Sequence, residues 1–327
     1  MTLSLLPSSS ASTPAPVEDG FDSAMLRLAT LLRAADYRFR TVTPATHQRI
    51  LDRGQRFALD LGDAFGWNMP FQATLLAGED CSQLAAAGVI VAHGNMWKAQ
   101  WRAAALGDLI VFHSSYPTEQ RDSVFFGPDT YRFISAIQRT LPSLAKRPSR
   151  VMEIGCGAGA AAIVLAAALP GAQVIAGDIN SRALALTALN ARVAQVSNLS
   201  AVTSNLLDGV DGNFDLIVAN PPYMLDAEAR TYRNGGGNYG EGLSVAMVRA
   251  GLDRLAPGGT LMLYTGTAVV RQCDQFWSAL APVLADIHCV WHYQEIDPDV
   301  FGEELEKPAY AKVERVAAVW LVVRMPD

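Results

Sequence analysis

The sequence lacks a long uninterrupted apolar stretch. Residues 151–169 come nearest, but Glu153 and several glycines interrupt them, and a membrane-spanning helix needs roughly 20 consecutive apolar residues. The first residues are rich in Ser, Pro and Ala and have neither the basic start nor the long apolar region of a secretion signal. We therefore expect a globular cytoplasmic protein that begins with a disordered tail over residues 1–18.

Cysteine is also scarce. The four cysteines are widely separated and show no paired metal-ligand spacing, so we expect reduced thiols and neither structural zinc nor any other bound metal.

An excess of basic residues is absent as well. Lys and Arg number 15 against 13 Asp and Glu in residues 1–150 (+2), and 11 against 19 in residues 151–327 (−8), which together give the net charge of −6. Long nucleic acid is bound largely through Lys and Arg, which makes an acidic chain a poor default binder. A local basic patch stays open, with solvated helix faces as the favoured alternative, at Arg33, Arg38, Arg40, Arg49, Arg53 and Arg56.

A chain of 327 residues predicts two domains. Apolar residues recur at helical spacing over residues 21–35 and 46–65, and short apolar runs follow. We predict a mainly helical accessory domain with a little strand over residues 19–113. Its histidines and tryptophans are expected to be packed core rather than ligands, namely His93, His113, Trp97 and Trp101.

Residues 114–149 connect the two halves. They are polar and rich in turns, they carry Phe125, Phe126 and Tyr131, and they contain a predicted helix over residues 130–141. The sequence supports two interpretations equally: the segment is a lid over the second domain, or it is a connector that the two phenylalanines anchor.

From residue 150 strands and helices alternate, which predicts a doubly wound α/β domain over residues 150–327 whose last strand, 315–324, is antiparallel to its neighbour. The first strand ends in a turn with glycines at 155, 157 and 159. Such a turn lets a ligand lie against bare backbone at a helix N-terminus. The second strand ends at Asp178, whose carboxylate suits a ribose diol. On these residues alone a dinucleotide site is also open, because the turn satisfies that fingerprint.

The apolar strand 214–219 is followed by Asn220-Pro221-Pro222-Tyr223. Open α/β folds bind ligands at the carboxyl ends of their strands. The prolines fix the backbone and donate no hydrogen bond. The amide, a proline carbonyl and the phenol ring suit a planar nitrogen group that carries hydrogens.

The Glu153-x-Gly155-x-Gly157-x-Gly159 spacing, followed by the Asn-Pro-Pro-Tyr motif, resembles class I S-adenosylmethionine-dependent methyltransferases. Residues 150–265 and the carboxyl-terminal strands look like the methyltransferase-small group, which includes release-factor glutamine methyltransferases and base-directed RNA methyltransferases. The resemblance implies a Rossmann-like sheet of seven strands and S-adenosyl-L-methionine as cofactor. It also implies the cofactor contacts: Glu153, Gly155, Gly157 and Gly159 at the methionine end, Asp178 at the ribose, Asn205 or Leu206 at the adenine, and further contacts from Ile179 and Asn220.

The chemistry that follows is methyl transfer to nitrogen, with Asn220, Pro221 and Tyr223 as catalytic residues. The Asn220 oxygen and the Pro221 carbonyl accept hydrogen bonds from the two N–H groups of an amide or aromatic amine and aim its nitrogen at the methyl group. Tyr223 stacks on the plane of the molecule that receives the methyl group. No general base is required before transfer.

An insertion over residues 226–243 follows the motif and has five glycines in residues 235–242. We predict a mobile loop with anion-binding capacity that recognises substrate, against the alternative of a plain surface loop. The substrate-binding candidates are Arg230, Arg233, Tyr239, Phe126 and Tyr131. Protein glutamine and a nucleic-acid base are the expected acceptors, and three other activities stay open: methylation of a small-metabolite amine or amide, an enzyme that transforms the cofactor itself, and a binding module without catalysis.

Overall fold

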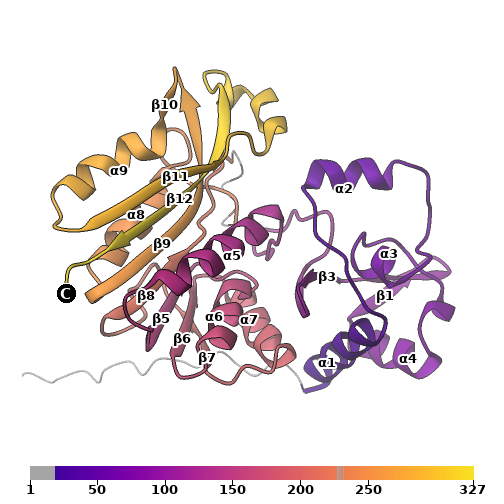
Figure 1. Cartoon of the computed structure of the whole chain (residues 1–327). Coiled ribbons are helices and arrows are strands. Elements are labelled where there is room, and N and C mark those ends of the chain that lie inside the picture. Colours follow the sequence, from indigo (N-terminus) through magenta and orange to yellow (C-terminus); the bar gives the residue numbers. More distant parts are fainter. Residues whose placement is uncertain (1–18, 227, 229, 231) are drawn as a thin grey trace, which may run out of the picture.

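The structure is a computed structural model that describes residues 19–226, 228, 230 and 232–327 (Figure 1). The disordered tail predicted for residues 1–18 lies outside these residues. Within the described ranges, no helix combines the length and the apolar character that crossing a membrane requires.

The first part of the chain is mainly helical, as predicted. It contains α1 (Asp19–Ala34), α2 (Pro44–Leu51), α3 (Leu61–Phe65) and α4 (Gly78–Ala86). The spacing of Met25, Leu28 and Leu32 places all three on the buried face of α1. The strand content is larger than expected, because two antiparallel hairpins follow: β1 (Ile90–His93) with β2 (Met96–Ala99), and β3 (Trp101–Leu106) with β4 (Leu109–Ser114).

Two predictions for this part need correction. The single helix expected over residues 46–65 is broken, because Gly54 has a left-handed backbone (φ +91°) and Asp60 starts α3 by accepting a hydrogen bond from the Asp63 amide. His93 is exposed at the end of β1, whereas His113 is fully buried with a ring nitrogen 3.2 Å from the Thr41 hydroxyl.

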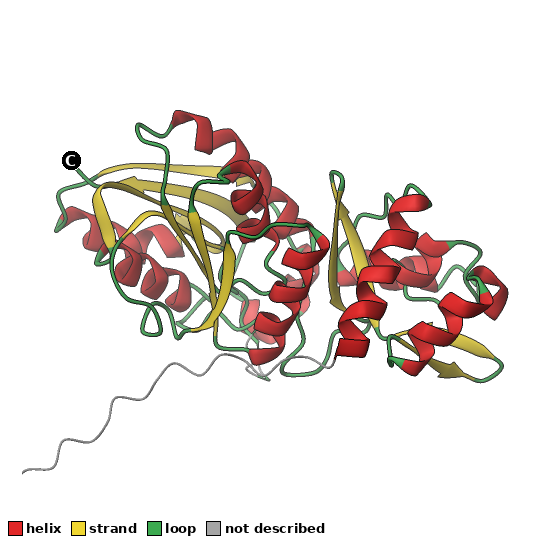
Figure 2. Ribbon diagram, turned by 90° about the horizontal axis from the view of Figure 1, so that it is seen from below, coloured by secondary structure: helices red, strands yellow, loops and turns green. Residues whose placement is uncertain are grey.

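The second part is a mixed sheet with helices on both faces, which confirms the predicted fold class (Figures 1 and 2). The strand order is β11-β12-β9-β8-β5-β6-β7, and β12 is antiparallel to both of its neighbours. The strands are β5 (Arg150–Ile154), β6 (Gln173–Asp178), β7 (Leu199–Thr203), β8 (Phe214–Ala219), β9 (Leu255–Val270), β11 (Val290–Asp297) and β12 (Arg315–Arg324), with the short β10 (Cys273–Asp274) paired to β9.

Alternate residues of the central strands enter different core clusters, one on each face of the sheet. Val151 of β5 packs in one cluster and Met152 in the other. Helix α6 (Ala160–Ala168) contacts both α5 (Pro128–Thr140) and α7 (Ser181–Val193), and α8 (Gly242–Leu252) contacts α9 (Gln275–Ala285).

The strand order reverses at β5. The chain runs from β5 outward to β6 and β7, and then returns to β8 on the other side of β5. The carboxyl ends of β5, β6 and β8 therefore meet where such folds form a ligand crevice. This topology brings the glycine turn, Asp178 and Asn220 to one edge of the sheet.

The accessory part docks beside α7. Asn190 of α7 accepts a hydrogen bond from the Phe112 amide (2.9 Å) and donates to the Phe112 carbonyl (3.0 Å) of β4. The same amide nitrogen lies 2.9 Å from the Ala158 carbonyl in the glycine turn. One buried side chain thus joins the accessory part to the site.

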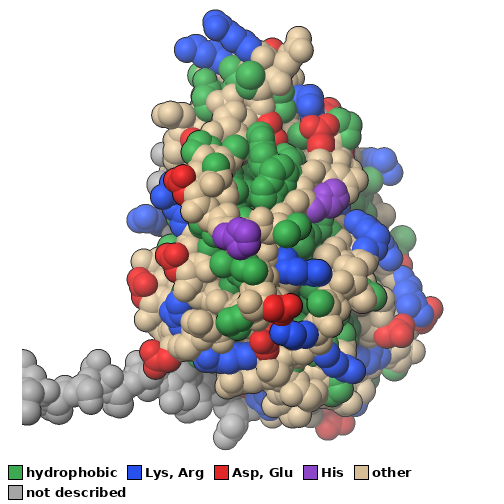
Figure 3. Space-filling model, turned by 60° about the vertical axis from the view of Figure 1, so that its left-hand side comes forward, with side chains coloured by type: hydrophobic (Ala, Val, Ile, Leu, Met, Phe, Trp, Pro, Cys, Tyr) green, Lys and Arg blue, Asp and Glu red, His purple; other side chains and the backbone are tan. Residues whose placement is uncertain are grey.

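The opposite end of the sheet is an edge formed by β11. Figure 3 shows a group of apolar side chains on the face of the molecule that carries this C-terminal part. Val290 and Trp291 of β11 are exposed, and the Trp291 ring lies 4.7 Å from the Trp277 ring of α9.

Candidate functional site

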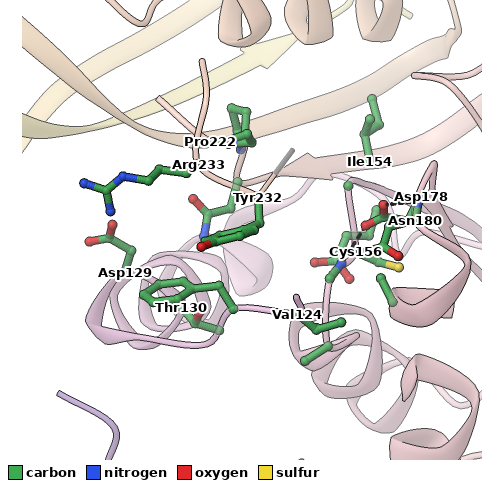
Figure 4. A pocket seen from close by; sticks show the side chains of 18 of the residues that line it. Val124, Asp129, Thr130, Ile154, Cys156, Asp178, Asn180, Pro222, Tyr232 and Arg233 are labelled. Atoms are coloured by element: carbon green, nitrogen blue, oxygen red, sulfur yellow. Dashed lines mark hydrogen bonds between the residues drawn. The ribbon is translucent and has the colours of Figure 1, made fainter. Parts of the chain in front are cut away.

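A cavity of about 240 Å³ lies at the carboxyl ends of β5, β6 and β8 (Figure 4). The glycine turn and Asp178 line it, and so do Asn220, Pro221, Pro222 and Tyr223. The two halves of the site that the sequence predicted separately therefore share one cavity.

The glycine turn has a left-handed backbone at each of its three glycines, with φ of +71° at Gly155, +54° at Gly157 and +75° at Gly159. A Cβ at Gly159 would lie 2.6 Å from the Thr187 side chain, so this glycine permits close packing of α6 on α7. A Cβ at Gly157 would meet nothing within 4 Å. At Gly157, bare backbone therefore faces open space.

Asp178 closes one side of the turn. Its Oδ2 accepts a hydrogen bond from the Gly157 amide and its Oδ1 accepts one from the Asn180 amide, both at 2.9 Å. Burial raises the pKa of this carboxyl, and the amide bonds oppose the shift. Ile179 beside it is 58% exposed and lines the cavity.

Asn205 and Leu206 line the cavity after β7, where the sequence predicted the adenine contacts. Glu153 lies at the base of the turn with only 4% of its surface exposed. Its carboxylate accepts a hydrogen bond from the Ala162 amide at 2.7 Å, in the first turn of α6. Burial raises the pKa of Glu153 to about 8.

Tyr223 is more tightly held than the sequence indicated. Its hydroxyl donates to the Asp129 carboxylate, and its ring lies edge-on to the Phe301 ring with centroids 6.4 Å apart. A Cβ at Gly266 would lie 2.0 Å from the Tyr223 ring. The ring lines the cavity from a fixed position, and its stacking on an acceptor stays a prediction.

The glycine-rich part of the insertion is closely packed, in place of the mobile loop that we predicted. A Cβ at Gly235 would lie 2.1 Å from the Gly240 carbonyl oxygen, and a Cβ at Gly240 would lie 2.0 Å from the Tyr223 carbonyl oxygen. The Gly235 amide also donates to the Met224 carbonyl at 2.9 Å. The glycines allow the insertion to pack against the backbone of the motif. Residues 227, 229 and 231 of the insertion lie outside the described residues.

The two arginines that we predicted to bind anions both form ion pairs within the chain, and their anion-binding role stays a prediction. Arg230 is 2.5 Å from the Asp226 carboxylate, and Arg233 is 2.5 Å from the Glu304 carboxylate. Arg233 does line the cavity. Both guanidinium groups are therefore already paired with carboxylates of the chain, one of which comes from a segment about 70 residues further along the sequence.

Of the other substrate-binding candidates, one lines the cavity and two do not. Phe126 lines the cavity and is buried against the His113 ring, with centroids 5.4 Å apart. Tyr131 accepts a hydrogen bond from the Thr41 amide at 3.1 Å and so joins α5 to the accessory part. Of the described residues that line the cavity, none is Arg230, Tyr131 or Tyr239.

The connector has features of both interpretations, the lid over the second domain and the segment anchored by phenylalanines. Its residues 123–126 form part of the cavity wall, with Phe126 as a buried anchor. Phe125 faces Tyr232 of the insertion, and the two rings are nearly parallel with centroids 6.3 Å apart. The Tyr232 hydroxyl donates to the Thr118 carbonyl at 2.6 Å. The connector and the insertion thus cover the cavity together.

Several cavity residues were missed by the sequence reasoning. Asp129 lies in the first turn of α5, where an acidic residue is ordinarily a favourable helix start. Tyr232 lies in the insertion between the two arginines that we selected as candidates. Phe301 is far from the Asn-Pro-Pro-Tyr motif in the sequence. The adjacent Gly127-Pro128 turn was the one available signal for Asp129.

Comparison with known proteins finds a family match over part of the chain. The methyltransferase small domain matches residues 135–271. The release factor glutamine methyltransferase of Deinococcus radiodurans is 35% identical over 166 residues, which is 47% of this chain and 55% of that protein. The Bradyrhizobium diazoefficiens enzyme of the same name is 32% identical over 170 residues, with 48% and 57% covered.

This chain thus spans a little over half the length of these curated relatives. A similar solved structure is the crystal structure of the M. jannaschii tRNA m1G37 methyltransferase, with a TM-score of 0.47, 14% identity, and coverage of 70% of this chain and 57% of that chain. Residues 135–271 therefore form a methyltransferase small domain of the S-adenosylmethionine-dependent class, related to that of the release factor glutamine methyltransferases.

Proposed function

We propose that this protein is an S-adenosylmethionine-dependent N-methyltransferase that acts on an amide or exocyclic amino nitrogen. One observation carries the proposal. Asn220 and Pro221 line the same cavity as Gly157 and Asp178, which supports an acceptor and a cofactor that share one space.

The residues present fit the cofactor. Gly157 offers bare backbone next to open space, and Asp178 offers a carboxylate. The exposed Ile179 offers an apolar surface for a flat ring. When bound, S-adenosylmethionine supplies an electrophilic methyl group on a sulfonium.

The acceptor residues work by positioning and electrostatics. The lone pair of an amide or aryl amine nitrogen is delocalised, which makes that nitrogen a weak nucleophile. The Asn220 side-chain oxygen and the Pro221 carbonyl oxygen accept hydrogen bonds from the two N–H groups of this nitrogen. These bonds raise the electron density on the nitrogen and orient it toward the methyl group. No side chain has to remove a proton first, because the nitrogen loses one to solvent after it gains the methyl group.

Glutamine in a protein is the acceptor that we favour. The similar proteins named above are release factor glutamine methyltransferases, and the net charge of −6 disfavours binding of long nucleic acid. A nucleic-acid base and a small amine or amide carry the same kind of nitrogen, so they enter the test as separate arms.

The test uses S-adenosylmethionine with a labelled methyl group. The purified chain is incubated with an unmethylated bacterial release factor, with total unmodified tRNA, or with a mixture of small amides and amines. We expect label in the release factor on a glutamine located by mass spectrometry. Cofactor turnover with no acceptor present would instead favour an enzyme that transforms the cofactor itself, and cofactor binding without turnover in any arm would favour a binding module.

The matched variants are Asn220→Ala and Asn95→Ala. Loss of an interaction made with the acceptor should lower turnover about 100-fold or more and leave the cofactor Kd within about twofold. Asn95 is exposed in the β1–β2 turn, and its removal should change neither quantity. Unchanged turnover in Asn220→Ala would refute the acceptor role of the motif.

A further inference from the structure

A buried carboxylate that the proposed chemistry does not use lies at the acceptor end of the cavity. Asp129 is the second residue of α5 and is 7% exposed. Figure 4 shows Asp129 and Asp178 at opposite ends of the cavity. Burial of a charge is costly unless hydrogen bonds compensate it, so the partners of Asp129 indicate its role.

These partners come from separate segments of the chain. The Tyr223 hydroxyl donates to Oδ2, and the Tyr264 hydroxyl of β9 donates to Oδ1 at 2.7 Å. Arg132, one turn further along α5, lies 3.3 Å from Oδ1 and is bonded on its other side to Asp297 at 2.9 Å. Burial raises the pKa of Asp129 and these bonds oppose the shift, while burial also raises the pKa of Tyr223 and keeps its hydroxyl a donor.

The hydrogen bond from the Tyr223 hydroxyl to Asp129 adds to other contacts that hold Tyr223 in place. Gly266 leaves no space for its ring to shift on one side, and Gly240 packs against its backbone carbonyl. The two prolines before it make the turn rigid. We therefore expect a displacement of Tyr223 to move Asn220, at the other end of the motif, with it.

We infer that Asp129 is a positioning residue, which holds the hydroxyl of Tyr223 and thereby sets the orientation of Asn220 and Pro221 toward the acceptor nitrogen. This inference rests on the proposed function. Asp129 acts through Tyr223, so the two residues form one unit. Without the carboxylate the buried hydroxyl loses its acceptor, and the motif must shift or admit water.

The kinetic test compares Asp129→Ala, Tyr223→Phe and the double variant in the three acceptor arms described above. Because small misplacements of positioned groups are costly, we expect Asp129→Ala to lower kcat about 10- to 100-fold. The cofactor Kd, measured by calorimetry, should stay within about twofold. In the Tyr223→Phe background, loss of Asp129 should lower kcat less than about threefold further, because residues of one unit are not additive.

Two further variants separate positioning from general stability. Asp129→Asn keeps an oxygen that accepts from the phenol, and it should recover much of the lost kcat. Tyr293→Phe removes the same kind of bond elsewhere, between Tyr293 of β11 and Asp274. It should lower the Tm without changing kcat. A loss of cofactor affinity in Asp129→Ala, or an equal loss of kcat with and without Tyr223, would overturn the inference.

A spectroscopic measurement keeps the inference distinct from the proposed function. In protein labelled with ¹³C at Cζ of tyrosine, the Tyr223 and Tyr264 signals are assigned from their Phe variants. Asp129→Ala should shift both signals. If no acceptor arm shows methyl transfer by the unmodified protein, the proposed function fails on that ground. An unchanged Tyr223 signal in Asp129→Ala would overturn the positioning role in either case.

Discussion

Substitution of Glu153 by glutamine should change how the stability of the protein depends on pH. The carboxyl is 4% exposed, and burial raises its pKa to about 8 in the folded protein. In an unfolded chain a glutamate titrates near 4.3. Between these two values the folded state holds a proton that the unfolded state has released, so the stabilising contribution is complete below the lower pKa and is lost as pH rises toward the higher one.

The magnitude follows from the size of this window. One bound proton makes the free energy of unfolding fall by about 1.4 kcal/mol per pH unit, and less near the folded-state pKa, so the unmodified protein should lose about 3.5 kcal/mol between pH 5 and pH 8 from this group. Glu153→Gln has no proton to release and keeps an oxygen for the Ala162 amide bond. Its stability relative to the unmodified protein should therefore rise by that amount across the same range.

Urea unfolding at pH 5, 6, 7 and 8 without cofactor, followed by tryptophan fluorescence, measures this difference. Glu119→Gln is the matched control, because Glu119 is exposed on the connector and its variant should track the unmodified protein. If the curves for Glu153→Gln and the unmodified protein stay parallel from pH 5 to pH 8, Glu153 is ionised in the folded state, and the reasoning from burial is refuted.

Other substitutions should separate binding from stability. Asp178→Ala should weaken cofactor binding by about 1 to 3 kcal/mol in calorimetry, for a lost charge-assisted hydrogen bond. Gly159→Ala should lower the free energy of unfolding by about 1 to 3 kcal/mol, because the backbone is left-handed and the new methyl group would meet Thr187. Asn190→Ala should loosen the accessory part, with faster limited proteolysis between the two parts and a loss of about 2 to 4 kcal/mol, because it leaves the Phe112 backbone groups buried without partners.

Much of the fold was predictable because the pattern is local. The alternation of strands and helices after residue 150 identifies the sheet, and the antiparallel direction of the last strand is confirmed. The break near Gly54 was not predicted, because apolar residues on both sides keep a helical spacing while the backbone at the glycine leaves the helix. Hydrophobic periodicity reports which residues are buried more reliably than where a helix ends.

The spatial grouping of the residues that we propose for the cofactor was predictable for the same reason. Gly155, Gly157 and Asp178 follow two adjacent parallel strands of one βαβ unit, so their positions in the sequence predict that they lie close together in the structure. Arg233 shows the limit of that reasoning. Its partner Glu304 is decided by tertiary packing, and no local pattern distinguishes a paired arginine from a free one.

The acceptor half combines parts of different origin. Asn220 and Tyr223 lie within residues 135–271, the range that matches the methyltransferase small domain. Phe125, Asp129 and Phe301 line the same cavity from outside that range. In the proposed function, the matched domain supplies the Asn220 amide oxygen and the Pro221 carbonyl oxygen that select a nitrogen as the methyl acceptor. The segments before and after it line the rest of the cavity, so we expect the connector and the carboxyl-terminal loop to select among molecules that carry such a nitrogen.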